Sequence, residues 1–210
     1  MNIYYIGGSP CSGKSTVAEL LAAKYNLYYF KVDDFLDNYT QMGAAQGYDI
    51  CKKQTCMCAE EIWMREPALQ CREEITFYKE IFAFIWEDLE KLNADGVITE
   101  GAAYLPELMK SFHIPKDRYV SITPSKEFQV AHYSQREWVP YVLADCSDQE
   151  KAFSNWMDRD AMFALEVQRQ CAEAHYCSII NDGTIELAQL VNSVEEVFQL
   201  KAFLEFPEMA

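Results

Sequence analysis

Positively charged residues are scarce in this sequence. Lysine and arginine together number 18 against 33 aspartates and glutamates, which gives a formal net charge of −15. Proteins that bind nucleic acids or anionic membranes do so through clustered Lys and Arg side chains. We therefore expect no nucleic acid and no membrane among the partners, and any anionic ligand must bind in a local basic pocket.

Long apolar runs are also lacking. None approaches the length of about 20 residues that crosses a bilayer, and the N-terminus has no basic segment followed by an apolar stretch. Half of the residues are apolar and 24% are charged, which is typical of a globular protein. We therefore expect the protein in the cytoplasm. We also expect one domain over residues 1–210, because no linker, repeat or low-complexity segment divides the chain. The oligomeric state stays open.

Histidine is rare, and the cysteines are not spaced as metal ligands. None of the three histidines has a Cys or His partner at ligand spacing. Cys51, Cys56 and Cys58 cluster, but their spacing is not that of a zinc site. Nothing marks the chain as secreted, so the eight cysteines are expected to be reduced thiols.

A short segment near the N-terminus carries the most specific signal. Residues 8–15, GSPCSGKS, fit the phosphate-binding pattern G-x-x-x-x-G-K-[ST], between a predicted strand at 2–6 and a predicted helix at 15–25. The glycines let backbone amides turn toward one anion, and Lys14 adds a point charge on the outer phosphates. Ser15 offers a hydroxyl to Mg²⁺. The predicted nucleotide-binding residues of this motif are Gly8, Ser9, Pro10, Cys11, Ser12, Gly13, Lys14, Ser15 and Thr16.

Strand and helix patterns alternate along the whole chain. Further strands are predicted at residues 27–32, 96–100, 119–123 and 177–180. Such alternation predicts an α/β fold in which helices cover both faces of a five-stranded parallel sheet. Ligands of these folds bind beyond the carboxyl ends of the strands, so residues that follow strands are expected to converge at one edge of the sheet.

The segments between the strands are helical to different degrees. Residues 36–56 contain Gly43 and Gly47 and show little periodicity, which predicts a loop. Residues 58–93 have a helical pattern with a break or a new helix at Pro67. Further helices are predicted at 105–112, in two pieces around Pro140 within 125–144, at 148–175 and at 184–203, with a turn at 181–183.

The phosphate loop and the order of the elements resemble the P-loop small-molecule and nucleotide kinases, a group that includes nucleoside kinases and the chloramphenicol phosphotransferase. The resemblance implies a three-layer α/β/α fold that uses ATP and Mg²⁺. It also implies a substrate-binding region at about residues 36–95, after the second strand. A helical lid is implied at about residues 124–160, after the fourth strand.

The same resemblance gives roles to the acidic residues that end two strands. Asp33, in VDDF (32–35), would orient or deprotonate the acceptor hydroxyl, and Asp34 would bind substrate or cap the next helix. These two roles remain interchangeable, and both residues also fit a simple strand end. Glu100, in VITEG (97–101), would bind Mg²⁺ or position the acceptor, although the family often has Asp here.

The resemblance also implies roles for three arginines. Arg136 and Arg159 follow the fourth strand, as do lid arginines that stabilise the transferring phosphoryl group, but each equally fits a surface ion pair. Arg65, in the substrate region, would bind an anionic group of the acceptor. The segment NDGT (181–184) resembles the loop that packs on adenine. Asp182 and Gly183 are therefore expected to bind the nucleotide.

The resemblance implies an ATP-dependent phosphotransferase that moves the γ-phosphate to a hydroxyl of a small molecule. The predicted catalytic residues are Lys14, Asp33, Glu100, Arg136 and Arg159. A nucleoside or nucleoside-monophosphate kinase is one alternative. The monophosphate kinase is less favoured, because the substrate region has few arginines to bind the phosphate of such an acceptor. An ATP-binding regulatory or scaffold protein without phosphotransfer is another. Aromatic and acidic residues in the substrate region favour a neutral or cationic, partly apolar acceptor.

Overall fold

The computed structural model describes residues 2–200, and a five-stranded sheet lies at its centre. The strands are β1 (Asn2–Gly8), β2 (Tyr28–Lys31), β3 (Gly96–Glu100), β4 (Tyr119–Pro124) and β5 (Cys177–Asn181). Their order is β2-β3-β1-β4-β5, and every neighbouring pair is parallel. Each strand lies where the sequence predicts it, because a buried parallel strand leaves a short apolar run in the sequence.

Helices connect the strands and continue beyond the last one. Their bounds are α1 (Lys14–Tyr25), α2 (Leu36–Gln46), α3 (Asp49–Cys56), α4 (Ala59–Trp63), α5 (Pro67–Glu90), α6 (Pro106–Ser111), α7 (Lys126–Tyr133), α8 (Val139–Val142), α9 (Gln149–Ala174) and α10 (Leu187–Phe198). Pro67 is the first residue of α5, which is one of the two possibilities that the sequence allows. Proline fits there because the backbone N–H that it lacks would have no acceptor within the first turn of the helix. The long predicted helix at 148–175 is confirmed as α9, with the Asp148 carboxylate accepting from the Lys151 amide at its N-terminus.

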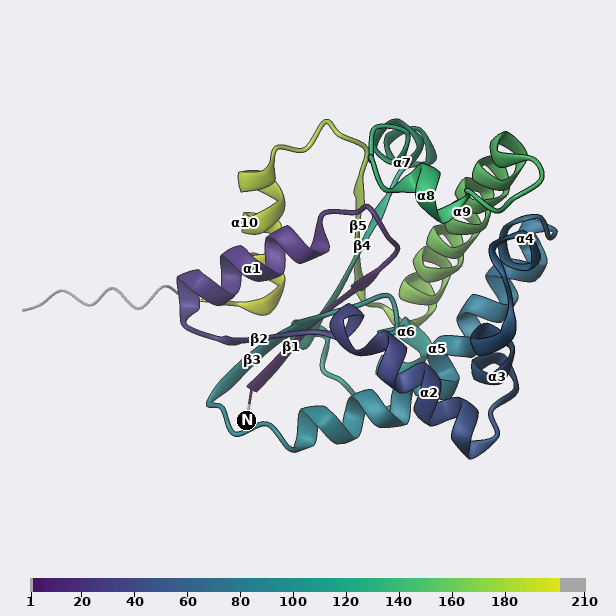
Figure 1. The fold of residues 1–210 in the computed structure, drawn as a ribbon. Helices are drawn as coiled ribbons and strands as arrows, with labels where there is room; N and C mark the ends of the chain where they lie inside the picture. The colour runs from purple at the N-terminus through teal and green to yellow at the C-terminus, as the bar shows by residue number, and fades with distance from the viewer. Residues whose placement is uncertain (1, 201–210) are drawn as a thin grey trace, which may run out of the picture.

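The two faces of the sheet are covered by different helices. Tyr4 and Ile6 of β1 pack in an apolar cluster with α1 and α10. Tyr5, between them in sequence, points to the other face and packs in a cluster with α5, α6 and α9. Figure 1 shows the same separation, with α1 and α10 on one side of the strands and α5, α6 and α9 on the other. The three-layer α/β/α fold is therefore confirmed.

The predicted loop at residues 36–56 is wrong, since this segment forms α2 and α3. Gly43 lies inside α2 where this helix packs on α3, and a Cβ at Gly43 would lie 2.5 Å from the Cys51 Sγ. Gly47 ends α2 with a φ of 97°, and its amide donates to the Ala44 carbonyl. A glycine at a close helix contact and a glycine at a helix C-terminus both resemble loop glycines in a sequence.

Beyond the carboxyl end of β4, helices α7 and α8 and the first turns of α9 form a cluster of their own. Its buried members are Tyr133, Val139, Leu143, Cys146, Ala152, Trp156 and Met157. The two predicted helical pieces are confirmed, but the break falls at residues 134–138. Pro140 is the second residue of α8, in the first turn, where proline is tolerated. In Figure 1 this cluster lies beyond the sheet, on the side of the phosphate loop.

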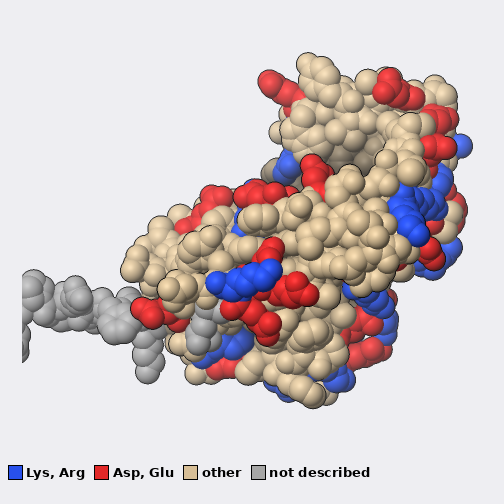
Figure 2. Space-filling view, turned by 60° about the horizontal axis from the view of Figure 1, so that its bottom comes forward, with Lys and Arg blue, Asp and Glu red and all other residues tan. Residues whose placement is uncertain are grey.

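The last helix begins later than the sequence predicts. Glu186 is the N-cap of α10, and the Thr184 hydroxyl donates instead to the Asp182 carboxylate at 2.6 Å. The helix ends at Phe198, and residues 201–203 of the predicted helix lie outside the described residues. Among residues 2–200, no helix has the length and the apolar character needed to cross a membrane. On the face shown in Figure 2, acidic and basic side chains are interspersed.

Candidate active site

The carboxyl ends of three neighbouring strands are brought to the same level by their register. Ile6 of β1 and Lys31 of β2 are both paired with Glu100 of β3. The segments that follow these strands are the phosphate loop, the Asp33 turn and the segment after Glu100. The predicted convergence of the candidate residues at one edge of the sheet is therefore confirmed for this group.

The phosphate loop needs its glycines at two points. Gly8 has a φ of 121°, and a Cβ there would lie 1.8 Å from the Ile122 carbonyl oxygen of β4. Gly13 has a φ of 90° and is the N-cap of α1. In the described structure α1 has no side-chain cap and no acidic residue in its first turn. Its first amides and its positive end therefore point into the loop, as an anion site requires.

A buried carboxylate lies directly beneath the loop. Glu100 is 0% exposed, and its Oε2 lies 3.6 Å from the Nζ of Lys14. Its Oε1 accepts hydrogen bonds from the Ser15 hydroxyl at 3.0 Å and from the Tyr29 hydroxyl at 3.1 Å. Burial and the Glu100 charge raise the pKa of the Tyr29 phenol, which keeps it a donor. Glu100 is thus held in one orientation by three side chains from α1 and β2.

These residues fit a magnesium ion. The Ser15 hydroxyl and the Glu100 carboxylate are oxygen donors in direct contact, as the hard cation prefers. Glu100 Oε2 is buried and, among the described residues, accepts no hydrogen bond. Such an oxygen can accept a hydrogen bond from a water molecule bound to a metal ion. Ser15 and Glu100 are therefore the residues that would hold Mg²⁺ beside the loop.

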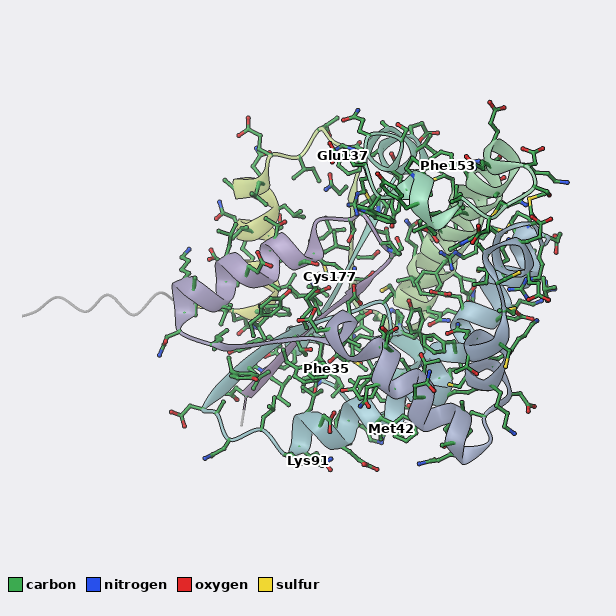
Figure 3. The ribbon with its side chains drawn as sticks, viewed as in Figure 1. Phe35, Met42, Lys91, Glu137, Phe153 and Cys177 are labelled. Carbon is green, nitrogen blue, oxygen red and sulfur yellow. The ribbon has the colours of Figure 1, made fainter. Side chains whose placement is uncertain are left out.

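Asp33 and Lys14 line the same cavity, which has a volume of about 500 Å³. Asp33 lies in a short 3₁₀ helix (Val32–Phe35) directly after β2. The Phe35 ring, labelled in Figure 3, stacks on Phe30 of β2 with ring centroids 5.1 Å apart, which packs this turn against the sheet. The Asp33 side chain keeps contact with solvent through the cavity, yet desolvation by the surrounding protein raises its pKa, against the opposing charge of Lys14.

Asp34 has a different environment from Asp33. Its side chain is 66% exposed, lies 3.9 Å from the Nζ of Lys31 and does not line the cavity. It also caps no helix, because the N-cap of α2 is Phe35 and makes no side-chain bond. Of the two interchangeable aspartates, the structure places Asp33 beside the phosphate loop.

One of the two predicted lid arginines lies over the loop. Arg136 lines the cavity, and its Nη2 is 3.8 Å from the Cys11 Sγ. The guanidinium carbon stands over two aromatic rings, 4.8 Å from the centroid of Tyr133 and 5.5 Å from that of Trp138. Because no carboxylate is within ion-pair distance in the described residues, the Arg136 charge is available to an anion in the cavity.

Arg159 and Arg65 lie elsewhere, around a second cavity of about 250 Å³. Arg159 forms ion pairs with Glu74 of α5 at 2.9 Å and with its neighbour Asp160 at 2.6 Å. Arg65 forms an ion pair with Glu73 at 2.5 Å. Neither lines the phosphate-loop cavity. Both arginines are therefore engaged by carboxylates in this structure, which for Arg159 is the ion-pair alternative that the sequence also allows.

We expect the Arg159→Met variant to lose about 3–5 kcal/mol of unfolding free energy, because Glu74 and the buried Asp160 would be left without their cation. Urea denaturation followed by circular dichroism measures this loss. Arg169→Met is a matched control on the same helix, since the Arg169 side chain forms exposed ion pairs with Glu166 and Glu173. Equal stability of the two variants would contradict a structural role for Arg159.

Asn181, the last residue of β5 and the first of the NDGT segment, contacts the phosphate loop. Asn181 Nδ2 donates to the Ser12 carbonyl at 3.0 Å, and Asn181 Oδ1 accepts from the Gly183 amide. A Cβ at Gly183 would lie 2.7 Å from the Phe128 ring of α7. Asp182 points to its own turn, where it accepts from Thr184. Asn181 thus contacts the phosphate loop, and Gly183 packs against α7.

Four aromatic residues of the site were not predicted as site residues. Tyr29 holds Glu100, while Tyr78, Tyr133 and Trp138 line the phosphate-loop cavity. Tyr78 belongs to the apolar stripe of α5, so its sequence position indicates core, and nothing in the sequence marks its hydroxyl. That hydroxyl donates to Glu74 Oε1 at 2.8 Å.

The structure combines a five-stranded parallel sheet, a phosphate loop between β1 and α1, and helical segments after β2 and β4. Together they are the three-layer α/β/α fold that the resemblance to the P-loop kinases implies. This arrangement explains why Lys14, Asp33 and Glu100 meet, since each follows or ends a neighbouring strand.

Comparison with known proteins gives solved structures only, since no family model and no curated protein matches this chain. Shikimate kinase from Bacteroides thetaiotaomicron shares 16% identity over 95% of this chain and 99% of that chain, with a TM-score of 0.49. Shikimate kinase from Aquifex aeolicus shares 20% over 95% and 96%, with a TM-score of 0.46. TT1252 from Thermus thermophilus shares 16% over 94% and 96%, with a TM-score of 0.49. Likeness at this level carries no statement about a reaction, so the functional argument rests on the site.

Proposed function

We propose that this protein transfers the γ-phosphate of ATP to a hydroxyl group of a small molecule. The observation that carries the proposal is that one cavity is lined by the phosphate loop, by Lys14, by Asp33 and by Arg136. A loop and a lysine alone suit any nucleotide-binding protein. A carboxylate that shares their cavity adds a group able to take the proton of an attacking hydroxyl.

Each residue has a role that follows from its place. Lys14 and the loop amides bind the β- and γ-phosphates, and Arg136 binds the charge of the γ-phosphoryl group from the lid side. The acceptor oxygen forms a bond to the γ-phosphorus while the bond from that phosphorus to the β–γ bridging oxygen breaks. ADP leaves, and the hydroxyl proton passes to Asp33. Held by Ser15 and Glu100, Mg²⁺ would neutralise charge on the phosphates.

The proposal includes a division of the domain. Residues of about 36–95, which form α2 to α5, would bind the acceptor, and residues of about 124–160 would act as the lid. The monophosphate-kinase alternative loses support, because Arg65 is paired with Glu73 and is not free to bind a second phosphate. The regulatory or scaffold alternative differs from the proposal in one measurable property, which is dependence of ADP formation on an acceptor.

The test is ADP release from ATP and Mg²⁺, measured with and without pools of nucleosides, sugars, amino alcohols and hydroxylated antibiotics. Acceptor-dependent release is expected, and splitting the active pool identifies the acceptor. ATP binding with no stimulation by any pool would contradict phosphotransfer and favour the regulatory or scaffold alternative.

The Arg136→Ala variant is expected to lower turnover about a hundredfold, because one positive charge on the phosphoryl group is lost. Among residues 2–200 no carboxylate pairs with Arg136, so the unfolding free energy should stay close to that of the unmodified protein. Steady-state kinetics with the identified acceptor measure the change in turnover. Arg118→Ala, which removes an arginine whose partner is the adjacent Asp117, is the control. Equal turnover of both variants would remove Arg136 from the reaction.

A further inference from the structure

The second cavity lies between α3, α4, α5 and α9, beside the phosphate-loop cavity. Figure 1 shows these four helices packed together on one side of the molecule. One hydrogen bond links the two cavities, because Tyr78 lines the phosphate-loop cavity and its hydroxyl donates to Glu74, which lines the second one. A molecule in the second cavity would therefore lie next to the space that holds the phosphates.

The charged groups around this cavity balance one another. Lys53 and Arg65 both pair with Glu73, each at 2.5 Å, and Arg159 pairs with Glu74 and with Asp160. Two cations, Arg65 and Arg159, and two anions, Glu73 and Glu74, thus line the cavity, and Lys53 and Asp160 pair with them from outside its wall. An anionic ligand could bind an arginine only by breaking its ion pair with a carboxylate. A cationic ligand could bind a carboxylate only by breaking its ion pair with an arginine. Breaking a partly buried pair leaves one charge without its partner, which is costly.

One uncharged polar group in the cavity wall lacks a hydrogen-bond partner among the described residues. The Gln70 side chain is only 4% exposed, and its Nε2 donates to the backbone carbonyls of Arg65 at 2.8 Å and Trp63 at 3.4 Å. These bonds fix the amide orientation, so the Oε1 atom is left as the open acceptor. Among the described residues it accepts no hydrogen bond, although it is buried. A buried acceptor in this state favours a ligand that donates a hydrogen bond.

Apart from Gln54, the rest of the wall is apolar or aromatic. Ile50, Met57 and Ile62 line the cavity together with Trp63. The Trp63 ring stacks on Trp156 with centroids 4.4 Å apart, which fixes its position. A flat or apolar part of a ligand gains burial against this surface.

We propose that the second cavity is the outer part of the acceptor site and that it selects an uncharged acceptor, with Gln70 Oε1 accepting a hydrogen bond from a hydroxyl or amide group of that molecule. The acceptor class is then a neutral, partly apolar molecule with one donor for Gln70 and one hydroxyl for phosphorylation. This inference rests on the proposed phosphotransfer, and it excludes the cationic and anionic acceptors that the sequence alone leaves open.

Three matched probes test the inference: para-(hydroxymethyl)benzamide, the corresponding benzoate and the corresponding benzylamine. They share a ring and a primary hydroxyl and differ in charge. Binding to the full chain is measured by calorimetry without nucleotide, and ADP release is measured separately. The neutral amide is expected to bind about tenfold more tightly than either charged probe. Equal or tighter binding of a charged probe, or no saturable binding of any probe, would overturn the inference.

Two variants assign the preference to the named residues. Gln70→Leu should weaken binding of the amide about tenfold and leave ATP binding unchanged, because one hydrogen bond to the ligand is lost. Glu73→Gln should strengthen binding of the benzoate about tenfold, since Arg65 and Lys53 are released. Gln41→Leu, at an exposed position of α2, is the control. Unchanged probe affinities in folded Gln70→Leu and Glu73→Gln would overturn the assignment.

The design separates failure of the inference from failure of the proposed function. Selective binding of the amide without ADP release would keep the neutral site and contradict phosphotransfer. ADP release stimulated most by a charged probe would keep phosphotransfer and contradict the neutral site. The preference among the three probes is measured on the unmodified protein, so the outcome does not depend on whether any variant folds.

Discussion

Replacing Lys14 with alanine is expected to abolish acceptor-dependent ADP release, with a loss on the order of a thousandfold or more. Lys14 supplies the buried positive charge within the phosphate loop, and its Nζ lies 3.6 Å from the Glu100 carboxylate. Without it, the phosphates would lose the lysine charge that offsets their repulsion by that carboxylate. Nucleotide binding by calorimetry and ADP release by a coupled assay measure the two losses separately.

The same substitution is also expected to destabilise the fold. Glu100 would remain buried without its cation, at a cost of about 3–5 kcal/mol. The Lys14→Ala/Glu100→Gln double variant removes both charges, so it should regain much of that stability while staying inactive. Lys24→Ala is the control, because Lys24 lies in the last turn of the same helix and is exposed. Full turnover of folded Lys14→Ala would contradict the assignment of the phosphate loop.

The sequence predicts the fold and the phosphate loop because both depend on local patterns. Each buried strand is a short apolar run, and the loop needs its glycines at Gly8 and Gly13 whatever the rest of the chain does. Asp33 and Glu100 could be predicted for a related reason, since Asp33 follows a strand, Glu100 ends one, and parallel strands end at one edge. Residues whose role follows from their position along the chain are the ones that sequence reasoning finds.

Roles that depend on packing between distant segments could not be predicted. Gly43 is inside a helix because α3 packs against it, and only the partner helix distinguishes this glycine from one in a loop. Arg159 pairs with Glu74, 85 residues away in the sequence. The sequence leaves its two alternatives open, since any of many carboxylates is a possible partner. Tyr29 and Tyr78 are hidden for the same reason, because their rings fit the core and only their hydroxyls reach the site.

Asp33 and Asp34 show how the structure separates two candidates that are adjacent in sequence. Asp33 shares the cavity with Lys14, whereas Asp34 points to solvent beside Lys31. A 3₁₀ turn immediately after β2 produces this difference, because it turns successive side chains to different sides. Asp34 therefore provides a control that matches Asp33 in residue type and in chain position.

The Asp33→Asn variant is expected to bind ATP as tightly as the unmodified protein and to lose turnover by a factor of about a hundred to ten thousand. Asparagine keeps the size of the side chain but accepts no proton from the acceptor hydroxyl. Asp34→Asn should keep full turnover. If Asp34→Asn loses turnover and Asp33→Asn does not, the proton acceptor is Asp34. Loss of ATP binding in Asp33→Asn would instead indicate a role in nucleotide binding.

The pH dependence gives an independent check of the same residue. Desolvation raises the pKa of Asp33, and only the ionised carboxylate accepts a proton. The fall in turnover with decreasing pH should therefore occur at a higher pH than an aspartate with an ordinary pKa would give.

A pKa that is higher in the folded than in the unfolded state also means that the stability contributed by Asp33 is lost as pH rises through that pKa. Asp33→Asn should therefore be at least as stable as the unmodified protein at neutral pH, as measured by urea denaturation. A marked loss of stability would show that the carboxylate supports the fold and not the reaction.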